Sequence, residues 1–248
     1  SIFSNQQLVQ GYRAVYQTLY KIRDYNLIME GKLHIGMILD GNRRYAELHR
    51  IPKEFEHLQG AYNMYRIISY ITSCKKHITE LTLYVLSYDN IIKRSLQEIQ
   101  EIYKLLDIFL LCLSLEDNKI YFRFVGEING NIPEKLQKKI KEIEKNNKKD
   151  YDIIINIALC YDGRKEIEQA SLLLQKHPSK KIKDFLYVKT DIDLVIRSGG
   201  AMRMSGFFPW QTTYSEWFFV DKFWPEFSSE DLDNILKEFK GRKRRFGK

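Results

Sequence analysis

The stretch HIGMILDGNRR, residues 34–44, joins an apolar run directly to a carboxylate, a glycine and two arginines. Gly41 lets the backbone turn tightly and expose its amide groups, which favours binding of an anion. Arg43 and Arg44 add guanidinium groups whose paired donors match phosphate oxygens. Asp40 would repel a phosphate unless a hard cation lay between them, and Mg²⁺ commonly binds one or two carboxylates together with substrate phosphates. The stretch therefore predicts a phosphate site assisted by Mg²⁺.

A second anion-binding cluster follows another apolar run, DIDLVIRSGG, at residues 191–200. Arg197, Arg203 and Ser205 lie close together in the chain, and the glycines between them permit close approach of a ligand. One arginine alone is usually part of a surface ion pair. Two such clusters instead predict one long substrate or two phosphorylated substrates. Because no glycine-rich dinucleotide or P-loop motif follows a strand, an oxidoreductase of the Rossmann type and a P-loop hydrolase are disfavoured.

Alternating strands and helices must position these residues. Apolar, β-prone runs predict six strands, at residues 35–39, 80–87, 119–128, 151–161, 191–200 and 213–220. Helical patterns lie between them, at residues 45–49, 56–72, 95–115, 133–149 and 164–176, and a basic helical tail follows. Four strands are nearly continuous in Val, Ile and Leu, which is typical of strands buried on both faces. We predict an α/β fold: a single domain with a mainly parallel six-stranded sheet flanked by helices.

Four of the predicted strands end in polar residues, at residues 40–44, 87–90, 161–164 and 197–200. In open α/β sheets ligands bind beyond the carboxyl ends of the strands. These four ends should therefore meet at one rim and form one site.

Composition bounds the class of protein. The 248 residues carry 40 Lys and Arg against 32 Asp and Glu, a net charge of +8 that suits anionic partners. Three well-separated cysteines predict neither a disulfide framework nor a zinc site and suit a reducing cytosol. Apolar runs fall far short of the roughly 20 residues of a spanning helix. We expect a cytoplasmic protein whose only membrane contact is peripheral, with an amphipathic helical segment at residues 1–30 before a catalytic domain at 31–248.

Several longer motifs carry a resemblance. They are HIGMILDGNRRYA, LTLYVLSYDN, NIALCYDGRKEI, DLVIRSGGAMRMSGFFPWQTTYSEWFF and the terminal RRFG. Together they resemble the cis-prenyltransferases, the family of undecaprenyl and dehydrodolichyl diphosphate synthases, with DGNRRYA closer to archaeal and eukaryotic members. The resemblance implies a homodimer with a hydrophobic tunnel and Mg²⁺. The implied reaction joins isopentenyl diphosphate repeatedly to an allylic diphosphate, such as farnesyl or geranylgeranyl diphosphate, and yields a cis-polyprenyl diphosphate, the precursor of a glycosyl-carrier lipid.

The resemblance also implies a role for individual residues. Those that match the family's catalytic groups are Asp40, Asn90, His57 and Ser87. Those that match its allylic diphosphate site are Gly41, Asn42, Arg43, Arg44, Tyr45 and Lys53. Those that match its isopentenyl diphosphate site are Arg197, Arg203, Ser205, Arg245 and Gly247, the last two in an R-x-G motif that reaches into the partner subunit's site. The implied metal ligands are Asp40 and Glu216.

Departures from the family pattern leave the preferred primer and the product length open. Asp89 and Ile91 replace a glutamate and a tryptophan, and Ala201 replaces a glutamate. One extra residue leaves open whether Lys93 or Arg94 takes the place of the family's arginine. Lys53 retains a charge but loses the paired donors of arginine.

Apolar side chains on two predicted helices either line the hydrocarbon tunnel or belong to an ordinary core. They lie in EIYKLLDIFLLCL, residues 101–113, and at Tyr65, Ile68 and Ile71.

Two other functions are weaker fits. A non-catalytic scaffold subunit of a two-component synthase would lack the Asp40 loop. A nucleic-acid-binding protein would need a basic stripe with exposed stacking aromatics, whereas these arginines lie in short motifs at strand ends. We expect no nucleic-acid partner.

Overall fold

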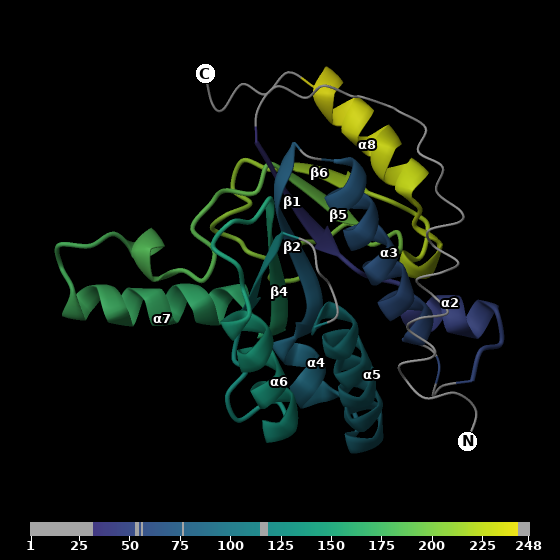
Figure 1. Ribbon diagram of the computed structural model, residues 1–248, viewed down its shortest axis with the longest axis horizontal. Coiled ribbons are helices and arrows are strands. Elements are labelled where there is room, and N and C mark those ends of the chain that lie inside the picture. Colours follow the sequence, from purple (N-terminus) through teal and green to yellow (C-terminus); the bar gives the residue numbers. More distant parts are fainter. Residues whose placement is uncertain (1–31, 53–54, 56, 76, 115–118, 243–248) are drawn as a thin grey trace.

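The structure is a computed structural model that describes residues 32–52, 55, 57–75, 77–114 and 119–242 (Figure 1). The predicted N-terminal segment at residues 1–30 lies outside the described residues, as do Lys53, Arg245 and Gly247. Within the described part, no helix is both long and apolar enough to span a bilayer.

Six strands form one sheet, and all of them run parallel. They are β1 (Leu33–Ile38), β2 (Ile78–Ser87), β3 (Ile120–Val125), β4 (Ile153–Tyr161), β5 (Leu194–Arg197) and β6 (Glu216–Phe219). Their order in the sheet is β3-β4-β2-β1-β5-β6, and every neighbouring pair is parallel. The predicted six-stranded α/β domain is confirmed. From β1 the chain first adds β2, β3 and β4 on one side of that strand and then crosses to add β5 and β6 on its other side. Parallel sheets bind ligands where the strand order reverses in this way, so a crevice is expected at the carboxyl end of β1.

Helices cover one face of the sheet. They include α3 (Leu58–Cys74), α5 (Leu96–Ser114), α6 (Glu134–Lys145) and α8 (Ser229–Gly241). In α3 the buried residues Met64, Ile67, Ile68 and Ile71 recur at three or four positions, which places them along one face of the helix. This stripe packs with apolar residues of the strands and of α5, α6 and α8 in the larger core.

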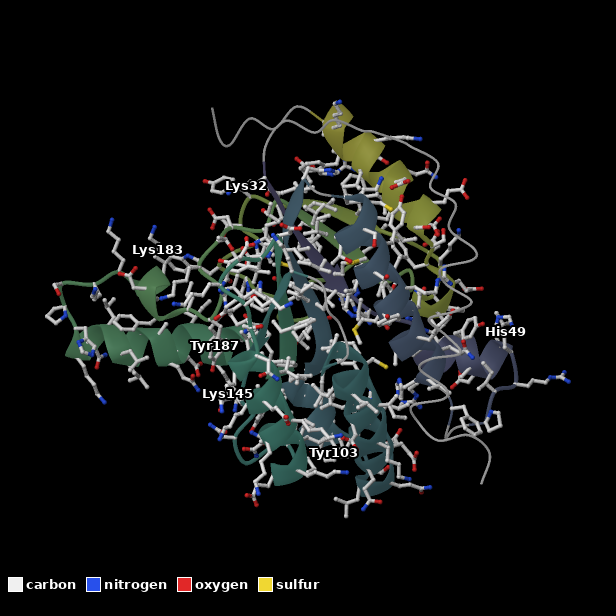
Figure 2. The ribbon with its side chains drawn as sticks, in the orientation of Figure 1. Lys32, His49, Tyr103, Lys145, Lys183 and Tyr187 are labelled. Atoms are coloured by element: carbon white, nitrogen blue, oxygen red, sulfur yellow. The ribbon has the colours of Figure 1, made fainter. Side chains whose placement is uncertain are left out.

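The other face of the sheet is covered by the start of α7 (Gly163–Lys176) and by the irregular segment 186–212. The short helix η2 (Ile182–Phe185) packs on α7. Buried aromatic rings, among them Tyr84, Tyr161, Phe207 and Phe208, fill this smaller core. Figure 1 shows α7 and η2 extending away from the sheet. Exposed side chains such as Lys145 and Lys183 lie at the periphery (Figure 2).

Two elements end earlier than the sequence predicts, one because of a side-chain hydrogen bond and one because of a backbone angle. The helix expected to reach residue 149 ends at Lys145, since Asn147 pairs with both the amide and the carbonyl of Phe122 in β3, at 2.8 and 2.7 Å. β3 ends at Val125 because Gly126 takes a φ of 122°, which an extended strand does not permit.

The strands predicted at residues 191–200 and 213–220 are shorter in the structure, at Leu194–Arg197 and Glu216–Phe219. Short helices are a further difference. Two of them lie at the carboxyl edge of the sheet: α2 (Asn42–Leu48) after β1, and α4 (Tyr88–Lys93) after β2. The helix α4 was not predicted, and η3 (Trp224–Glu226) follows β6.

Candidate active site

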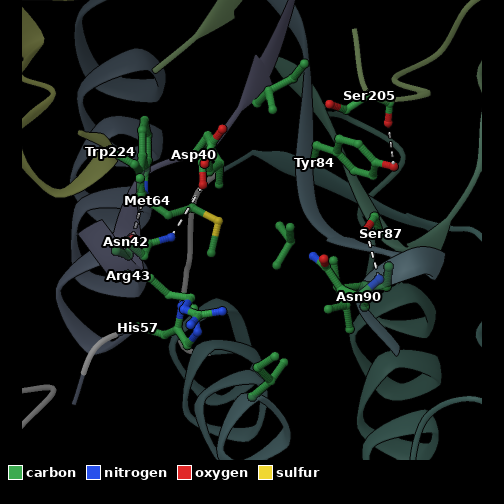
Figure 3. Close-up of a pocket in the computed structure, with 18 of the residues that line it drawn as sticks. Asp40, Asn42, Arg43, His57, Met64, Tyr84, Ser87, Asn90, Ser205 and Trp224 are labelled. Atoms are coloured by element: carbon green, nitrogen blue, oxygen red, sulfur yellow. Dashed lines mark hydrogen bonds between the residues drawn. The ribbon is translucent and has the colours of Figure 1, made fainter. Parts of the chain in front are cut away.

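Polar side chains from four strand ends meet around one cavity of about 870 Å³ at the carboxyl edge of the sheet. Asp40 follows β1, Ser87 and Tyr161 end β2 and β4, and Arg197 ends β5. The register pairs Ile38 with Arg197 and Ser87 with Tyr161, so these ends are level across the sheet. Figure 3 shows Asp40 and Ser87 on opposite walls. The convergence expected from the sequence is present.

The Asp40 carboxylate accepts hydrogen bonds from two arginines. Arg197 Nη2 lies 2.9 Å from Asp40 Oδ2, and Arg44 Nη2 lies 3.2 Å from Oδ1. The Arg197 side chain is 4% exposed, whereas those of Asp40 and Arg44 are 29% and 47% exposed. Arg44 also donates to the carbonyl of Gly199 at 2.7 Å. The guanidinium groups that the sequence assigns to phosphate therefore also neutralise Asp40 within the chain.

The backbone around Asp40 is held from three directions. Ser198 Oγ donates to the Asp40 carbonyl at 2.8 Å and accepts from the Asp40 amide at 3.1 Å. The Trp224 amide donates to the same carbonyl at 3.0 Å. Gly41 has a φ of 108°, and a Cβ there would lie 2.8 Å from the Phe223 ring. Both the left-handed backbone and the close aromatic ring therefore require glycine at this position.

Asn42 is packed against the start of α3. Its Nδ2 donates to the Leu39 carbonyl at 3.4 Å, while its Oδ1 is buried without a hydrogen-bond partner among the described residues. A Cβ at Gly60 would overlap that oxygen. Trp224 Nε1 donates to the Gly60 carbonyl at 2.8 Å, which fixes the backbone there. Gly60 therefore leaves the space that the Asn42 side chain occupies.

His57 lies at the cavity between α2 and α5, beside two arginines. Burial, together with the charges of Arg94 and Arg43, lowers the pKa of His57 to about 4. The imidazole is therefore neutral at neutral pH. Arg94 Nη1 lies 3.5 Å from His57 Nε2 and Arg94 lines the cavity, whereas the Lys93 side chain is 69% exposed and pairs with Asp89. Of the two alternatives that the sequence left open, Arg94 is the one that faces the site.

Ser87 and Asn90 come together through the first turn of α4. Ser87 Oγ accepts a hydrogen bond from the Asn90 amide at 3.2 Å and so caps that helix. Both residues line the cavity, and Figure 3 shows the Asn90 side chain on the wall opposite His57. The cap fixes Asn90 relative to the end of β2.

The second predicted cluster is built on Arg197. Its Nη1 donates to Ser205 Oγ at 2.7 Å and also to the carbonyl of Arg203. Ser205 lines the cavity, while the Arg203 side chain is exposed and does not belong to the lining. Arg197 therefore bridges Ser205 and Asp40, and so joins the two clusters that the sequence treated separately.

The deeper wall of the cavity is apolar. It is formed by Ile102, Leu105, Leu106 and Phe109 of α5 and by Met64 of α3. Tyr65, Ile68 and Ile71 are not among its lining residues. Ile68 and Ile71 belong to the core beneath it. The stretch 101–113 therefore contributes both to the cavity wall and to the core, since Leu110 and Leu113 belong to the core.

Comparison with known proteins shows the family of the chain that carries this cavity. A family model described as putative undecaprenyl diphosphate synthase matches residues 38–247. The chain belongs to this family of cis-prenyltransferases. Similar relatives include an isoprenyl transferase of Fusobacterium nucleatum, 36% identical over 225 residues, with 86% of this chain and 95% of the relative covered.

Archaeal and structural relatives agree with the family. A tritrans,polycis-undecaprenyl-diphosphate synthase (GGDP specific) of Sulfolobus acidocaldarius is 33% identical over 257 residues, covering 95% of this chain and 97% of the relative. The crystal structure of lavandulyl diphosphate synthase from Lavandula x intermedia, in complex with dimethylallyl diphosphate, has a TM-score of 0.80 at 27% identity, covering 87% and 98% of the two chains. A probable undecaprenyl diphosphate synthase from Campylobacter jejuni has a TM-score of 0.74 at 28% identity, covering 89% of this chain and all of that one.

Besides Arg203, two other described residues that the cis-prenyltransferase resemblance singled out do not line the cavity. Glu216 begins β6 level with Leu194, toward the amino edge of the sheet, and binds Arg242 at 2.9 Å. The Tyr45 ring packs on His49 with a centroid distance of 4.3 Å. Neither Glu216 nor Tyr45 belongs to the cavity lining.

Among the lining residues of this cis-prenyltransferase that sequence reasoning missed are Tyr84, Met64 and Trp224. Tyr84 falls inside an apolar strand run, and Met64 inside an amphipathic helix, so both patterns indicate core. Trp224 precedes a proline beyond the last strand and carries no local sign of a site. Its hydrogen bonds to Gly60, Asn63 and Asp40 all join it to residues that are distant in sequence.

Proposed function

We propose that this cis-prenyltransferase condenses isopentenyl diphosphate repeatedly onto farnesyl or geranylgeranyl diphosphate, and so makes a cis-polyprenyl diphosphate for a glycosyl-carrier lipid. Relatives of both primer classes support the choice: one from Buchnera aphidicola is named farnesyl-diphosphate specific and one from Pyrococcus horikoshii geranylgeranyl-diphosphate specific. The observation that carries the proposal is the single cavity in which an arginine-bound carboxylate faces an apolar wall of α3 and α5.

The allylic substrate would place its diphosphate by Gly41, Asn42 and Arg43 and its hydrocarbon against α5. The Arg43 side chain is 53% exposed, and its nearest carboxylate, that of Glu98, lies 3.8 Å away. Such a weakly held guanidinium can turn to a phosphate at little cost. The apolar wall excludes water from the hydrocarbon and leaves room for a growing chain.

Mg²⁺ is the proposed metal, held by Asp40 together with diphosphate oxygens. The described residues contain no group of three or more His, Cys, Asp or Glu side chains that could hold an ion by themselves. Asp40, a partly exposed carboxylate in a cavity rimmed by arginines, fits an ion that takes only one or two protein ligands. When bound, Mg²⁺ supplies positive charge that stabilises the departing diphosphate.

The chain's own residues would orient the two substrates for substitution. Arg197 and Ser205 would hold isopentenyl diphosphate on the wall opposite the allylic diphosphate. The isopentenyl double bond then forms the new carbon–carbon bond as the allylic carbon–oxygen bond breaks, diphosphate leaves with the electron pair, and loss of one proton restores a double bond. Asn90 and neutral His57 lie on the two walls between which this happens. Alignment within one cavity supplies most of the rate enhancement.

A homodimer would complete the site. Arg245 and Gly247 are proposed to reach a partner's isopentenyl diphosphate, and Glu216 is proposed to join a metal site only after release from Arg242. The edge position of β6 leaves one side of Glu216–Phe219 without a neighbouring strand in the described sheet. Two exposed apolar residues lie close in sequence to lining residues: Leu48 follows Glu47, and Leu96 is two residues after Arg94. They support peripheral contact with a membrane that would receive the product.

The decisive experiment incubates the full chain with labelled isopentenyl diphosphate, an allylic primer and Mg²⁺, and measures label extractable into organic solvent. Farnesyl and geranylgeranyl diphosphate are compared as primers, and chromatography of dephosphorylated products gives the chain length. Omission of Mg²⁺ with added EDTA should abolish incorporation. No extractable label with either primer would refute the proposed reaction, while full incorporation in EDTA would refute only the metal.

A further inference from the structure

The Tyr84 hydroxyl joins β2 to the loop that carries Ser205 (Figure 3). Tyr84 Oη lies 3.3 Å from the carbonyl oxygen of Ser205 and 3.1 Å from that of Tyr161. A phenol has one hydrogen to donate, so this hydrogen is shared between the two carbonyls. The hydroxyl therefore ties the loop after β5 to the end of β4.

The Ser205 loop has a backbone that needs such support. Ser205 and Phe208 have φ values of 50° and 40°, and Gly206 between them has 75°. Residues with a Cβ adopt this left-handed region at a cost in free energy. The Gly163 amide donates to the Gly206 carbonyl at 3.1 Å, which leaves the Ser205 carbonyl to Tyr84. The loop is thus held at two successive carbonyls by two different elements.

The Tyr84 ring is fixed independently of its hydroxyl. Its centroid lies 5.5 Å from that of Phe207 and 5.9 Å from that of Tyr161, and Tyr161 stacks on Phe208 at 4.1 Å. The residue is only 9% exposed. Because these contacts belong to the ring, replacing tyrosine by phenylalanine removes the donor and keeps the packing.

The Tyr84 hydroxyl keeps its hydrogen at neutral pH. Burial, and then the nearby carboxylates of Asp162 and Asp89, raise the pKa of Tyr84 above its ordinary value.

The loop position matters because Ser205 Oγ accepts from Arg197, whose second nitrogen binds Asp40. We propose that Tyr84 is a positioning residue: by holding the Ser205 carbonyl, its hydroxyl sets the place of Ser205 Oγ and Arg197 and hence the affinity for isopentenyl diphosphate. The inference rests on the proposed assignment of Ser205 and Arg197 to that substrate. We expect a smaller effect on the allylic substrate, since Asn42 and Arg43 lie on the wall opposite Ser205 (Figure 3).

The test compares Tyr84→Phe with Tyr187→Phe in the incorporation assay. Tyr187 lies beside α7 (Figure 2), and its hydroxyl donates to Gln169 at 3.3 Å in an exposed hydrogen bond outside the cavity. Loss of one neutral hydrogen bond should raise the KM for isopentenyl diphosphate about three- to tenfold in Tyr84→Phe. The KM for the allylic primer, and both KM values of Tyr187→Phe, should stay within about twofold of wild type, the scale of an exposed contact.

A double-mutant cycle with Ser205→Ala tests the route of the effect. If Tyr84 acts through Ser205, Tyr84→Phe should raise the KM for isopentenyl diphosphate by less than about twofold in the Ser205→Ala background. Three results would each overturn the proposal. They are an unchanged KM for isopentenyl diphosphate in Tyr84→Phe, an equal rise in the KM for both substrates, and a rise that is as large in the Ser205→Ala background as in the wild type. A wild-type chain that incorporates no label would instead refute the proposed function, so the two failures are distinguishable.

Discussion

Replacing Asp40 by asparagine should separate substrate binding from turnover. Asp40→Asn keeps the shape of the side chain but removes the charge that Arg197 and Arg44 share at 2.9 and 3.2 Å. Turnover should be lost, because the proposed Mg²⁺ loses its only ligand from this cavity rim. Diphosphate binding without metal should become tighter, since both guanidinium groups lose a competing anion.

The size of each effect follows from the burial of the groups. Removing a charge about 4 Å from a substrate phosphate in a water-exposed setting changes its energy by about 1 kcal/mol, which corresponds to about fivefold in affinity. Breaking a fully buried ion pair costs about 3–5 kcal/mol. Arg197 is 4% exposed but Asp40 is 29% exposed, and Arg197 retains its bond to Ser205. We therefore expect the free energy of unfolding to fall by about 2 kcal/mol, between the buried and exposed limits.

Calorimetric titration with isopentenyl diphosphate in EDTA measures the affinity, urea unfolding measures the stability, and label incorporation measures turnover. The control is Asp150→Asn, which removes the same charge from an exposed pair with Lys119 at 2.7 Å. It should change the free energy of unfolding by less than about 1 kcal/mol. Weaker binding by Asp40→Asn in EDTA would refute the reasoning, because it would mean that the carboxylate does not compete with the substrate for the arginines.

Three further predictions concern the same cavity. The pKa of His57 is about 4 in the folded chain and 6.5 ordinarily, so as the pH falls the unfolded chain takes up the proton at a higher pH than the folded chain does. Stability should fall as pH drops from about 6.5 to about 4, and His57→Gln should flatten urea-unfolding free energies in that window. Arg94→Ala should reduce incorporation while Lys93→Ala leaves it near wild type, and the reverse order would contradict the assignment. Gly60→Ala should displace Asn42 and cost about 1–3 kcal/mol of stability, measured by thermal unfolding with incorporation assayed in parallel.

Strand positions could be predicted because nearly continuous runs such as Ile153–Ala158 leave little choice but a buried parallel strand. The rim could be predicted as well, since the carboxyl ends of such strands share one edge. The pairing of Arg197 with Asp40 could not, because a contact across 157 residues leaves no local pattern in either motif.

The assignment of Arg94 rather than Lys93 required the orientation of α4. Lys93 is the last residue of α4, whereas Arg94 follows it with an extended backbone, φ −87° and ψ 155°, so the two side chains leave the chain in different directions. Sequence alone did not predict α4, because its six residues continue directly from the polar end of β2 and are held by the Ser87 cap. The sequence pattern also indicated Tyr84 only as a core residue. Its ring does belong to the core, and only its hydroxyl reaches the loop that carries Ser205.

The central place of β1 in the sheet also determines when the site can exist during folding. The Asp40 loop is synthesised before the residues that shape it, because its carbonyl accepts a hydrogen bond from Trp224 and its carboxylate one from Arg197, both far downstream. Loop closure over such separations is slow compared with the formation of local helices. The nascent chain therefore completes its sheet before it completes its active site, and a chain cut before β5 would carry the Asp40 loop without the groups that shape it.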